Sequence, residues 1–261
     1  MRLFLVFFKY HVKERMEYRA AFLIGAFAQI IAYAANYLVV WMLMQQFETI
    51  NGWTWPEVAF LYSISLFVYA IGASFTFVQM QFLEDMVRDG TFDTILIKPR
   101  NPYFYFVTST FNNAYIAHLL LSGSILVWSL GQLGFKWDLF NIVFFILCLI
   151  SGSLIIAGML TIIGSLTFKV VRLRFLFSLF NRMREFISYP ISIYHFAIQV
   201  MLIFIIPMAF VNFVPSSLLL GKDMIVMNEI AYIAPFVGPV LFYVSYKLWM
   251  RNVNHYQGAG G

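Results

Sequence analysis

The sequence has little charge and almost no cysteine. Only 11% of its 261 residues are Asp, Glu, Lys or Arg, while 62% are hydrophobic and the mean hydropathy is +0.81. Soluble domains are about a quarter charged and about half apolar, and this chain has too few polar residues to cover a soluble core. It is therefore expected to cross a membrane several times. Its single cysteine, Cys148, excludes a disulfide framework within the chain.

The motifs of common catalytic sites are also missing from the sequence. It contains no Walker motif to cradle ATP phosphates, no H-E-x-x-H and no G-x-S-x-G, and its one Cys and four His lack metal-ligand spacing. We therefore expect no catalytic residue, metal or cofactor in this chain. The basic residues behind the net charge of +5 are placed according to membrane topology, and the charge does not indicate a nucleic-acid partner.

Acidic residues are absent from the middle of every long apolar run. All 12 of them lie outside these runs or at their edges. Carriers driven by protons or sodium usually place acidic residues near the bilayer midplane, where they bind the coupling ion. The sequence therefore argues against an ion-driven carrier and places the energy source outside this chain.

Six apolar runs of about 20 residues or more are long enough to cross a ~30 Å hydrocarbon core as helices. The predicted spans are residues 21–44, 57–82, 104–130, 139–168, 187–214 and 229–250. The expected fold is an all-α membrane protein, with residues 1–261 in a single transmembrane domain. Pro190 and Pro207 interrupt the fifth run, where they either mark a gating kink or are ordinary prolines of a membrane helix. The small residues between Ser151 and Gly164 favour close helix packing in the fourth run.

The distribution of Lys and Arg predicts the orientation. Of the 17 basic residues, 15 fall before the first span, in the second-to-third and fourth-to-fifth connectors, or at the C-terminal end. Because cytoplasmic loops carry an excess of Lys and Arg, both termini are expected in the cytoplasm.

Two segments and two histidines allow more than one interpretation. Residues 2–19 are either an amphipathic helix lying on membrane lipid at the cytoplasmic interface or a straight extension of the first span. Residues 214–228 are either a re-entrant or interface-lying pair of short helices on the outer side or a simple loop. His118 and His195 fall within predicted spans, where a neutral side chain satisfied by a neighbouring helix is favoured over a proton relay.

A charged connector is predicted at residues 83–103, and its residues 88–102 read "RDGTFDTILIKPRNP". Gly90 suits a tight turn or a helix C-terminal cap, and Thr91 can cap a short helix that has Asp93 in its first turn. Apolar residues at i, i+3 and i+4 predict a ridge on this helix: Phe92, Ile95 and Leu96. Pro99 and Pro102 end the element. The ridge needs something to dock against, either a partner or the lipid surface.

This connector resembles the first cytoplasmic loop of type-2 ABC exporter permeases, the ABC-2 membrane proteins. "GTFDTILIKP" is similar to the family pattern of Gly-Thr, a hydrophobic residue, an acid, two further hydrophobic residues and a Pro, preceded by another acid. "IPMAFVNFVP" at residues 206–215 and the tail "HYQGAGG" also resemble one bacterial subfamily, although Gly258 stands where that subfamily has Ser.

The resemblance implies a role for each matching residue in the connector. Glu84 matches the preceding acid, Gly90 the turn, and Thr91 with Asp93 the cap. The docking ridge is matched by Phe92, Ile95 and Leu96, and the exit by Pro99.

The resemblance also implies an assembly and a location. Two six-span permease subunits, as a homodimer or a heterodimer, are expected in a bacterial inner membrane, with separate ATPase subunits that carry ATP and Mg beneath them. The cargo is expected to be amphipathic or lipidic, because the spans are rich in aromatic and apolar residues. The alternative from another class is a secondary carrier or channel that works alone.

Overall fold

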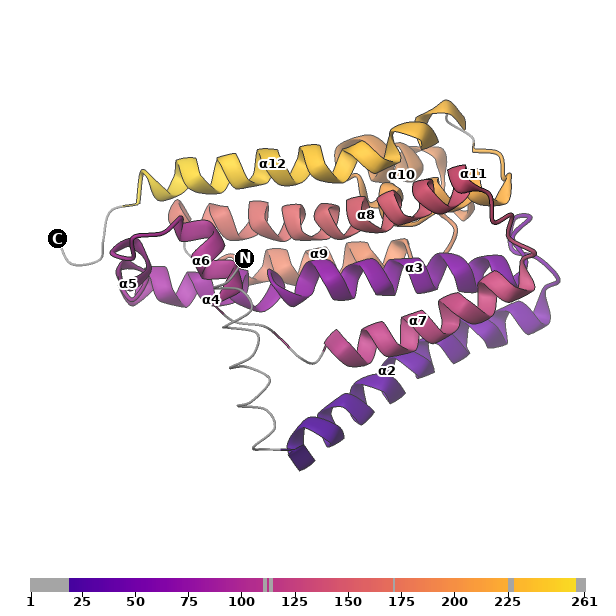
Figure 1. Cartoon of the computed structure of the whole chain (residues 1–261), viewed down its shortest axis with the longest axis horizontal. Helices are drawn as coiled ribbons and strands as arrows, with labels where there is room; N and C mark the ends of the chain where they lie inside the picture. Colours follow the sequence, from indigo (N-terminus) through magenta and orange to yellow (C-terminus); the bar gives the residue numbers. More distant parts are fainter. Residues whose placement is uncertain (1–18, 110–111, 113–114, 171, 225–227, 257–261) are drawn as a thin grey trace.

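The computed structural model describes residues 19–109, 112, 115–170, 172–224 and 228–256. In this part of the chain all regular structure is helical, apart from one isolated bridge between Ile50 and Trp53. The long helices run roughly side by side (Figure 1). They are α2 (Arg19–Gln46), α3 (Trp55–Ser74), α7 (Tyr115–Gln132), α8 (Leu139–Ser165) and α12 (Ala234–Val253).

Shorter helices extend or connect the long ones. Four precede α8 or follow it directly: α4 (Phe77–Arg88), α5 (Asp93–Leu96), α6 (Pro102–Thr108) and η1 (Leu166–Phe168). The rest lie between α8 and α12: α9 (Arg174–Phe186), η2 (Ile191–Ile193), α10 (Phe196–Val200), the π-helical η3 (Met201–Ile205), η4 (Met208–Val211), α11 (Phe213–Leu220) and η5 (Asn228–Ile233).

Five helical stretches of the described residues are long and apolar enough to cross a membrane. They are Phe27–Gln46, Trp55–Arg88, Tyr115–Gln132, Leu139–Phe168 and Asn228–Val253. Each overlaps a span predicted from the sequence. Near Ser74 the second stretch bends into α4, and the third predicted span is divided into α6 and α7. The all-α membrane fold predicted from the sequence is confirmed.

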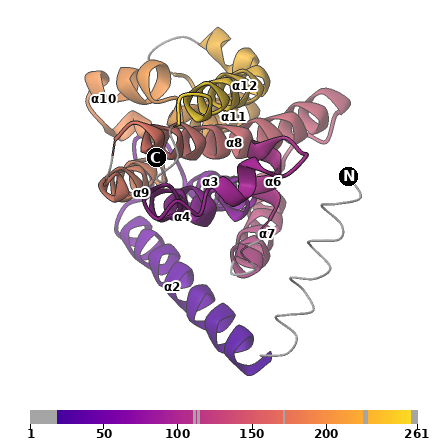
Figure 2. The same cartoon turned by 90° about the vertical axis from the view of Figure 1, so that its left-hand side faces the viewer.

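Small residues bring α8 close to two other helices. Ser151 donates its hydroxyl to the carbonyl of Ala234 at 2.6 Å and accepts the N–H of Gly238 at 2.9 Å, which joins α8 to α12. On α3, a Cβ at Gly72 would lie 2.8 Å from the Cβ of Ile156 on α8. These close approaches place α8 between α3 and α12, and α2 diverges from the bundle toward its N-terminal end (Figures 1 and 2).

The fifth predicted span, residues 187–214, is interrupted where Pro190 and Pro207 precede η2 and η4. The chain there is divided among four short elements from η2 to η4 and the start of α11. The amphipathic helix α9, predicted to be part of a cytoplasmic connector, contacts α4 through Phe177 against Phe77 and α3 through Arg184 against Tyr69. With 13 residues it is shorter than a helix that crosses a membrane.

The second ambiguous segment contains a short helix that is covered by protein. Residues Phe213–Ser217 of α11 are buried, and α11 ends at Gly221, whose φ is +64°. Lys222 then pairs at 2.9 Å with Glu57, in the first turn of α3. The structure therefore agrees with a buried helical element here rather than an exposed loop. The predicted interface helix at 2–19 lies outside the described residues except for Arg19.

Candidate functional site

Gly90 forms the turn that separates α4 from the connector. Its φ is +71°, a left-handed conformation that glycine adopts without steric cost. The N–H groups of Gly90 and Phe92 donate to the carbonyls of Val87 at 3.4 Å and Met86 at 3.1 Å. These bonds satisfy the last carbonyls of α4, which otherwise have no partner at a helix end.

Thr91 does not cap α5, in contrast to the sequence-based prediction. The residue before α5 is Phe92, with helical dihedrals and no capping side chain. The Thr91 hydroxyl donates backward to the carbonyl of Met86 at 3.5 Å. Asp93 does occupy the first turn of α5, where a negative charge is favourable. Thr91 therefore contributes to the end of α4 rather than to the start of α5.

The predicted docking ridge is divided between the core and the surface. Phe92 is completely buried, and Ile95 is only 6% exposed. The ring of Phe92 lies within 6.3 Å of four other aromatic rings, measured between centroids: Phe106, Phe168, Trp249 and Tyr256. Phe92 and Ile95 therefore anchor the connector to the transmembrane core in this fold instead of lying on its surface. Their role in docking stays a prediction.

The exposed apolar edge of the connector consists of Leu96 and Ile97. Leu96 is 37% exposed and Ile97 is 77% exposed, although Ile97 was not predicted from the sequence. Pro99, the predicted exit, is exposed beside them, as are Lys98 and Arg100. A tip with two large apolar side chains and a basic rim is suited to binding a partner. The pattern of hydrophobic residues did not reveal Ile97, because it lies just beyond the i, i+3, i+4 series.

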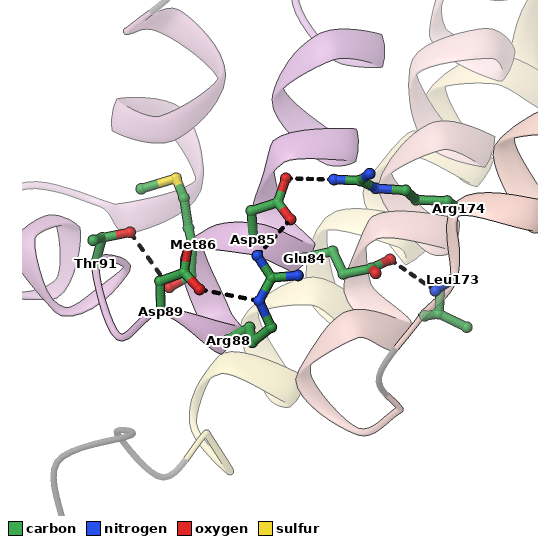
Figure 3. Close-up of polar contacts among 8 residues, drawn as sticks. All are labelled: Glu84, Asp85, Met86, Arg88, Asp89, Thr91, Leu173 and Arg174. Atoms are coloured by element: carbon green, nitrogen blue, oxygen red, sulfur yellow. Dashed lines mark hydrogen bonds and ion pairs between the residues drawn. The ribbon is translucent and has the colours of Figure 1, made fainter.

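Glu84 connects the connector to α9. Its side chain is 6% exposed, and its carboxylate accepts the N–H of Leu173 at 2.8 Å (Figure 3). The neighbouring Asp85 pairs with Arg174 at 2.6 Å and with Arg88 at 3.1 Å. The end of α4 is thus joined to the start of α9 by one buried hydrogen bond and a more exposed ion-pair network.

Asn101 fixes the other end of the connector and was not recognised in the sequence. Its side-chain oxygen accepts the N–H of Phe104 at 3.2 Å and caps α6, while its amide donates to the Tyr246 hydroxyl on α12 at 2.7 Å. The Asn-Pro pair at 101–102 is a recognisable signal, since Asn caps helices and Pro suits the first helical position.

The two histidines have structural partners. Nε2 of His118 lies 2.8 Å from the side-chain oxygen of Gln29 on α2, in agreement with the expectation of a neutral side chain satisfied by a neighbouring helix. His195 caps the short helix α10, where its Nδ1 accepts the N–H of Ala197 at 3.3 Å. Within the described residues, no cluster of three or more His, Cys, Asp or Glu could hold a metal ion.

The sequence of the chain matches the model of a known protein family. The family model described as "ABC-2 family transporter protein" matches residues 30–260, almost the whole chain. The chain belongs to this family. As an ABC-2 family protein it is a membrane permease of an ABC transporter, and membership of this family implies association with ABC ATPase subunits. No curated protein and no solved structure matches it.

Replacement of Gly90 is expected to lower the stability of this ABC-2 permease. Gly90→Ala places a Cβ in the left-handed region at a cost of about 1–2 kcal/mol, whereas Gly90→Asn should cost less because Asn tolerates this conformation. Thermal unfolding of the purified chain in detergent checks this ranking. Equal midpoints for the alanine variant and the wild type would contradict the left-handed turn.

Removal of the Glu84 carboxylate is expected to loosen the contact between α4 and α9. Glu84→Ala leaves the Leu173 N–H without its acceptor in a buried position, which costs about 1–3 kcal/mol; Glu84→Gln keeps an acceptor and should cost less. Asp85→Asn is the matched control, because its ion pairs are partly exposed and worth about 1 kcal/mol or less. Hydrogen exchange over 169–178 measures the effect. Equal exchange in Glu84→Ala and Asp85→Asn would contradict it.

Proposed function

We propose that this chain is the membrane-spanning subunit of an ATP-driven exporter, and that its connector at residues 83–103 receives the motion of a separate ATPase. The observation that carries the proposal is the exposed apolar edge of Leu96 and Ile97 on a connector that Phe92 anchors in the core. A hydrophobic tip on a flexible loop would not transmit force. A tip joined to a buried aromatic cluster can.

Three contacts support the idea that a push on this tip reaches the transmembrane helices. The Phe92 ring contacts Trp249 of α12 at 6.0 Å between centroids. Asn101 bonds to Tyr246 of the same helix, and Glu84 bonds to the start of α9. Displacement of the connector would therefore load α12 and α9 together, one on each side of α8.

The proposed orientation and assembly follow from charge and family. With Arg182 and Arg184 removed from the cytoplasmic connectors, 13 basic residues remain on the proposed cytoplasmic side against two on the other. This asymmetry still favours cytoplasmic termini in a bacterial inner membrane. Two permease subunits, identical or different, would stand above two ATPase subunits, which would carry ATP and Mg.

Reconstitution tests the proposal against a carrier or channel that works alone. The permease is placed in liposomes with or without an ABC ATPase from the same genome, and export of fluorescent amphipathic dyes and lipids is followed. We expect transport only when the ATPase and MgATP are both present. Equal flux from the permease alone would overturn the proposal.

A further inference from the structure

Arg184 occupies an unusual position for a charged residue in a membrane protein. Along α9, Leu173 contacts Glu84, Phe177 contacts Phe77, and the guanidinium of Arg184 lies 4.1 Å from the ring centroid of Tyr69. These successive contacts show that α9 runs antiparallel to α4 and α3 (Figure 1). The end of α9 therefore lies beside the middle of the membrane-spanning stretch Trp55–Arg88.

The depth of Tyr69 follows from its neighbours on α8. Val68 packs against Gly152, close to the middle of the apolar stretch Leu139–Phe168. Arg184 thus reaches the central part of the apolar layer. A basic side chain is costly at the centre of a membrane helix, and such residues mark binding sites or pathways. The contact with Tyr69 offsets a part of this cost.

Arg184 is not paired with an acid in the part of the fold that the structure describes. Its neighbours on the helix, Arg182 and Glu185, are both exposed. Arg174, at the cytoplasmic start of α9, is already paired with Asp85. Among the described residues, no carboxylate forms an ion pair with Arg184, and its buried Nε has no hydrogen-bond partner. Within the described part of the chain, the guanidinium of Arg184 therefore lacks a paired counter-ion.

A cavity of about 260 Å³ lies beside this guanidinium. Its polar lining comes from α2, α3, α9 and the residues that follow α9: Tyr33, Asn36, Tyr62, Arg184, Ser188 and Tyr189. Glu185 also lines it, and Val39 and Val40 of α2 form an apolar wall. Hydroxyl and amide groups around a guanidinium form the donor set that binds a phosphate or a carboxylate.

We propose that this cavity binds the anionic headgroup of an amphiphile, with Arg184 as the counter-ion. The volume holds a headgroup rather than a whole lipid, and the apolar wall continues toward the chains of such a molecule. The binding site itself is independent of the proposed coupling to an ATPase. The identification of the amphiphile as transported cargo rests on the proposed function.

Binding to the purified full chain tests the site without any ATPase. The probe is dodecyl phosphate, added to the chain in the uncharged detergent dodecyl maltoside and followed by titration calorimetry. We expect Arg184→Gln to weaken binding about 10-fold or more, because it removes a charge-assisted hydrogen bond. The matched control is Arg182→Gln, which removes the same charge from the same helix outside the cavity lining, and should weaken binding less than about 3-fold.

Further variants keep the test meaningful if Arg184→Gln does not fold. Arg184→Lys retains the charge and should retain part of the affinity, and Tyr62→Phe should weaken binding by removing one hydroxyl donor. Dodecanol and inorganic phosphate should each bind much more weakly than dodecyl phosphate. Equal losses in Arg182→Gln and Arg184→Gln, or equal binding of dodecanol, would overturn the proposal. Absence of binding by the wild type would also overturn the proposal. The counter-ion of Arg184 would then have to come from a second copy of the chain.

Two sources can supply the headgroup, and two further measurements distinguish them. Competition by phosphatidylglycerol in nanodiscs would identify the ligand as a bilayer lipid. Stimulation of ATP hydrolysis by dodecyl phosphate in the assembled exporter, without such competition, would identify it as cargo. Both results support an anionic headgroup at Arg184. Failure of stimulation with intact binding would count against the cargo role alone.

Discussion

Ile97→Asp is expected to abolish association between the permease and its ATPase while leaving the permease folded. The side chain is 77% exposed and has little to lose within its own chain. In the proposed complex it would be buried, and a carboxylate there would be desolvated without a partner. Losses of about 2 kcal/mol or more, about 30-fold in affinity, are typical of residues at the centre of an interface. Pull-down of the ATPase and its hydrolysis rate in the complex measure the effect.

Conservative changes at the same tip provide the controls. Ile97→Leu keeps the apolar surface and should keep both association and hydrolysis close to the wild type. Lys98→Ala removes an exposed rim charge and should have a small effect. If the Ile97→Asp permease inserts into the membrane and still binds the ATPase as the wild type does, then the ATPase contacts another part of the permease.

Phe92→Ala is expected to have the largest effect on stability of any change in the connector. The ring is fully buried among four aromatic neighbours, and its loss leaves a cavity between the connector, α6, η1 and α12. Truncation of a buried Phe to Ala usually costs about 3–5 kcal/mol. Thermal unfolding in detergent should show a clear loss, and the ATPase should dissociate as a consequence of the disordered connector.

Leu96→Ala separates this anchoring role from a docking role. It shortens an exposed side chain in the same short helix and should change stability by less than about 1 kcal/mol, while weakening association with the ATPase. If Phe92→Ala instead kept its stability and lost only association, the ring would contact the ATPase directly, and the anchoring role would be wrong.

The transmembrane helices could be predicted where apolar runs were long and had no charge in their interior. Leu139–Phe168 contains no charged residue and Trp55–Arg88 has charges only near its two ends, so that length and composition alone require a membrane. The fifth predicted span is divided into short elements after Pro190 and Pro207. The preceding helix α9 brings Arg184 against Tyr69, a contact that local composition cannot show because it joins residues more than 100 positions apart.

The connector was predicted in outline, but not the direction in which its apolar residues point. Gly90 adopts the left-handed turn that its sequence context favours. An apolar series at i, i+3 and i+4 indicates that a face is hydrophobic, yet it does not tell whether that face meets the core or a partner. The aromatic residues that cover Phe92 come from α6, η1, α12 and the segment that follows α12. Only the folded arrangement reveals Ile97 as the exposed residue.

A cysteine introduced at position 97 tests the central claim most directly. Cys148 is buried, which makes labelling of the Ile97→Cys variant by a membrane-impermeant maleimide specific. Lys136→Cys, on the exposed loop before α8, is the matched control for the opposite side. We expect the Ile97→Cys variant to be labelled only in inside-out vesicles and to be protected by the added ATPase. The Lys136→Cys variant should be labelled only in right-side-out vesicles, without protection. Labelling of the Ile97→Cys variant from the outside, or unchanged labelling with the ATPase bound, would contradict the account.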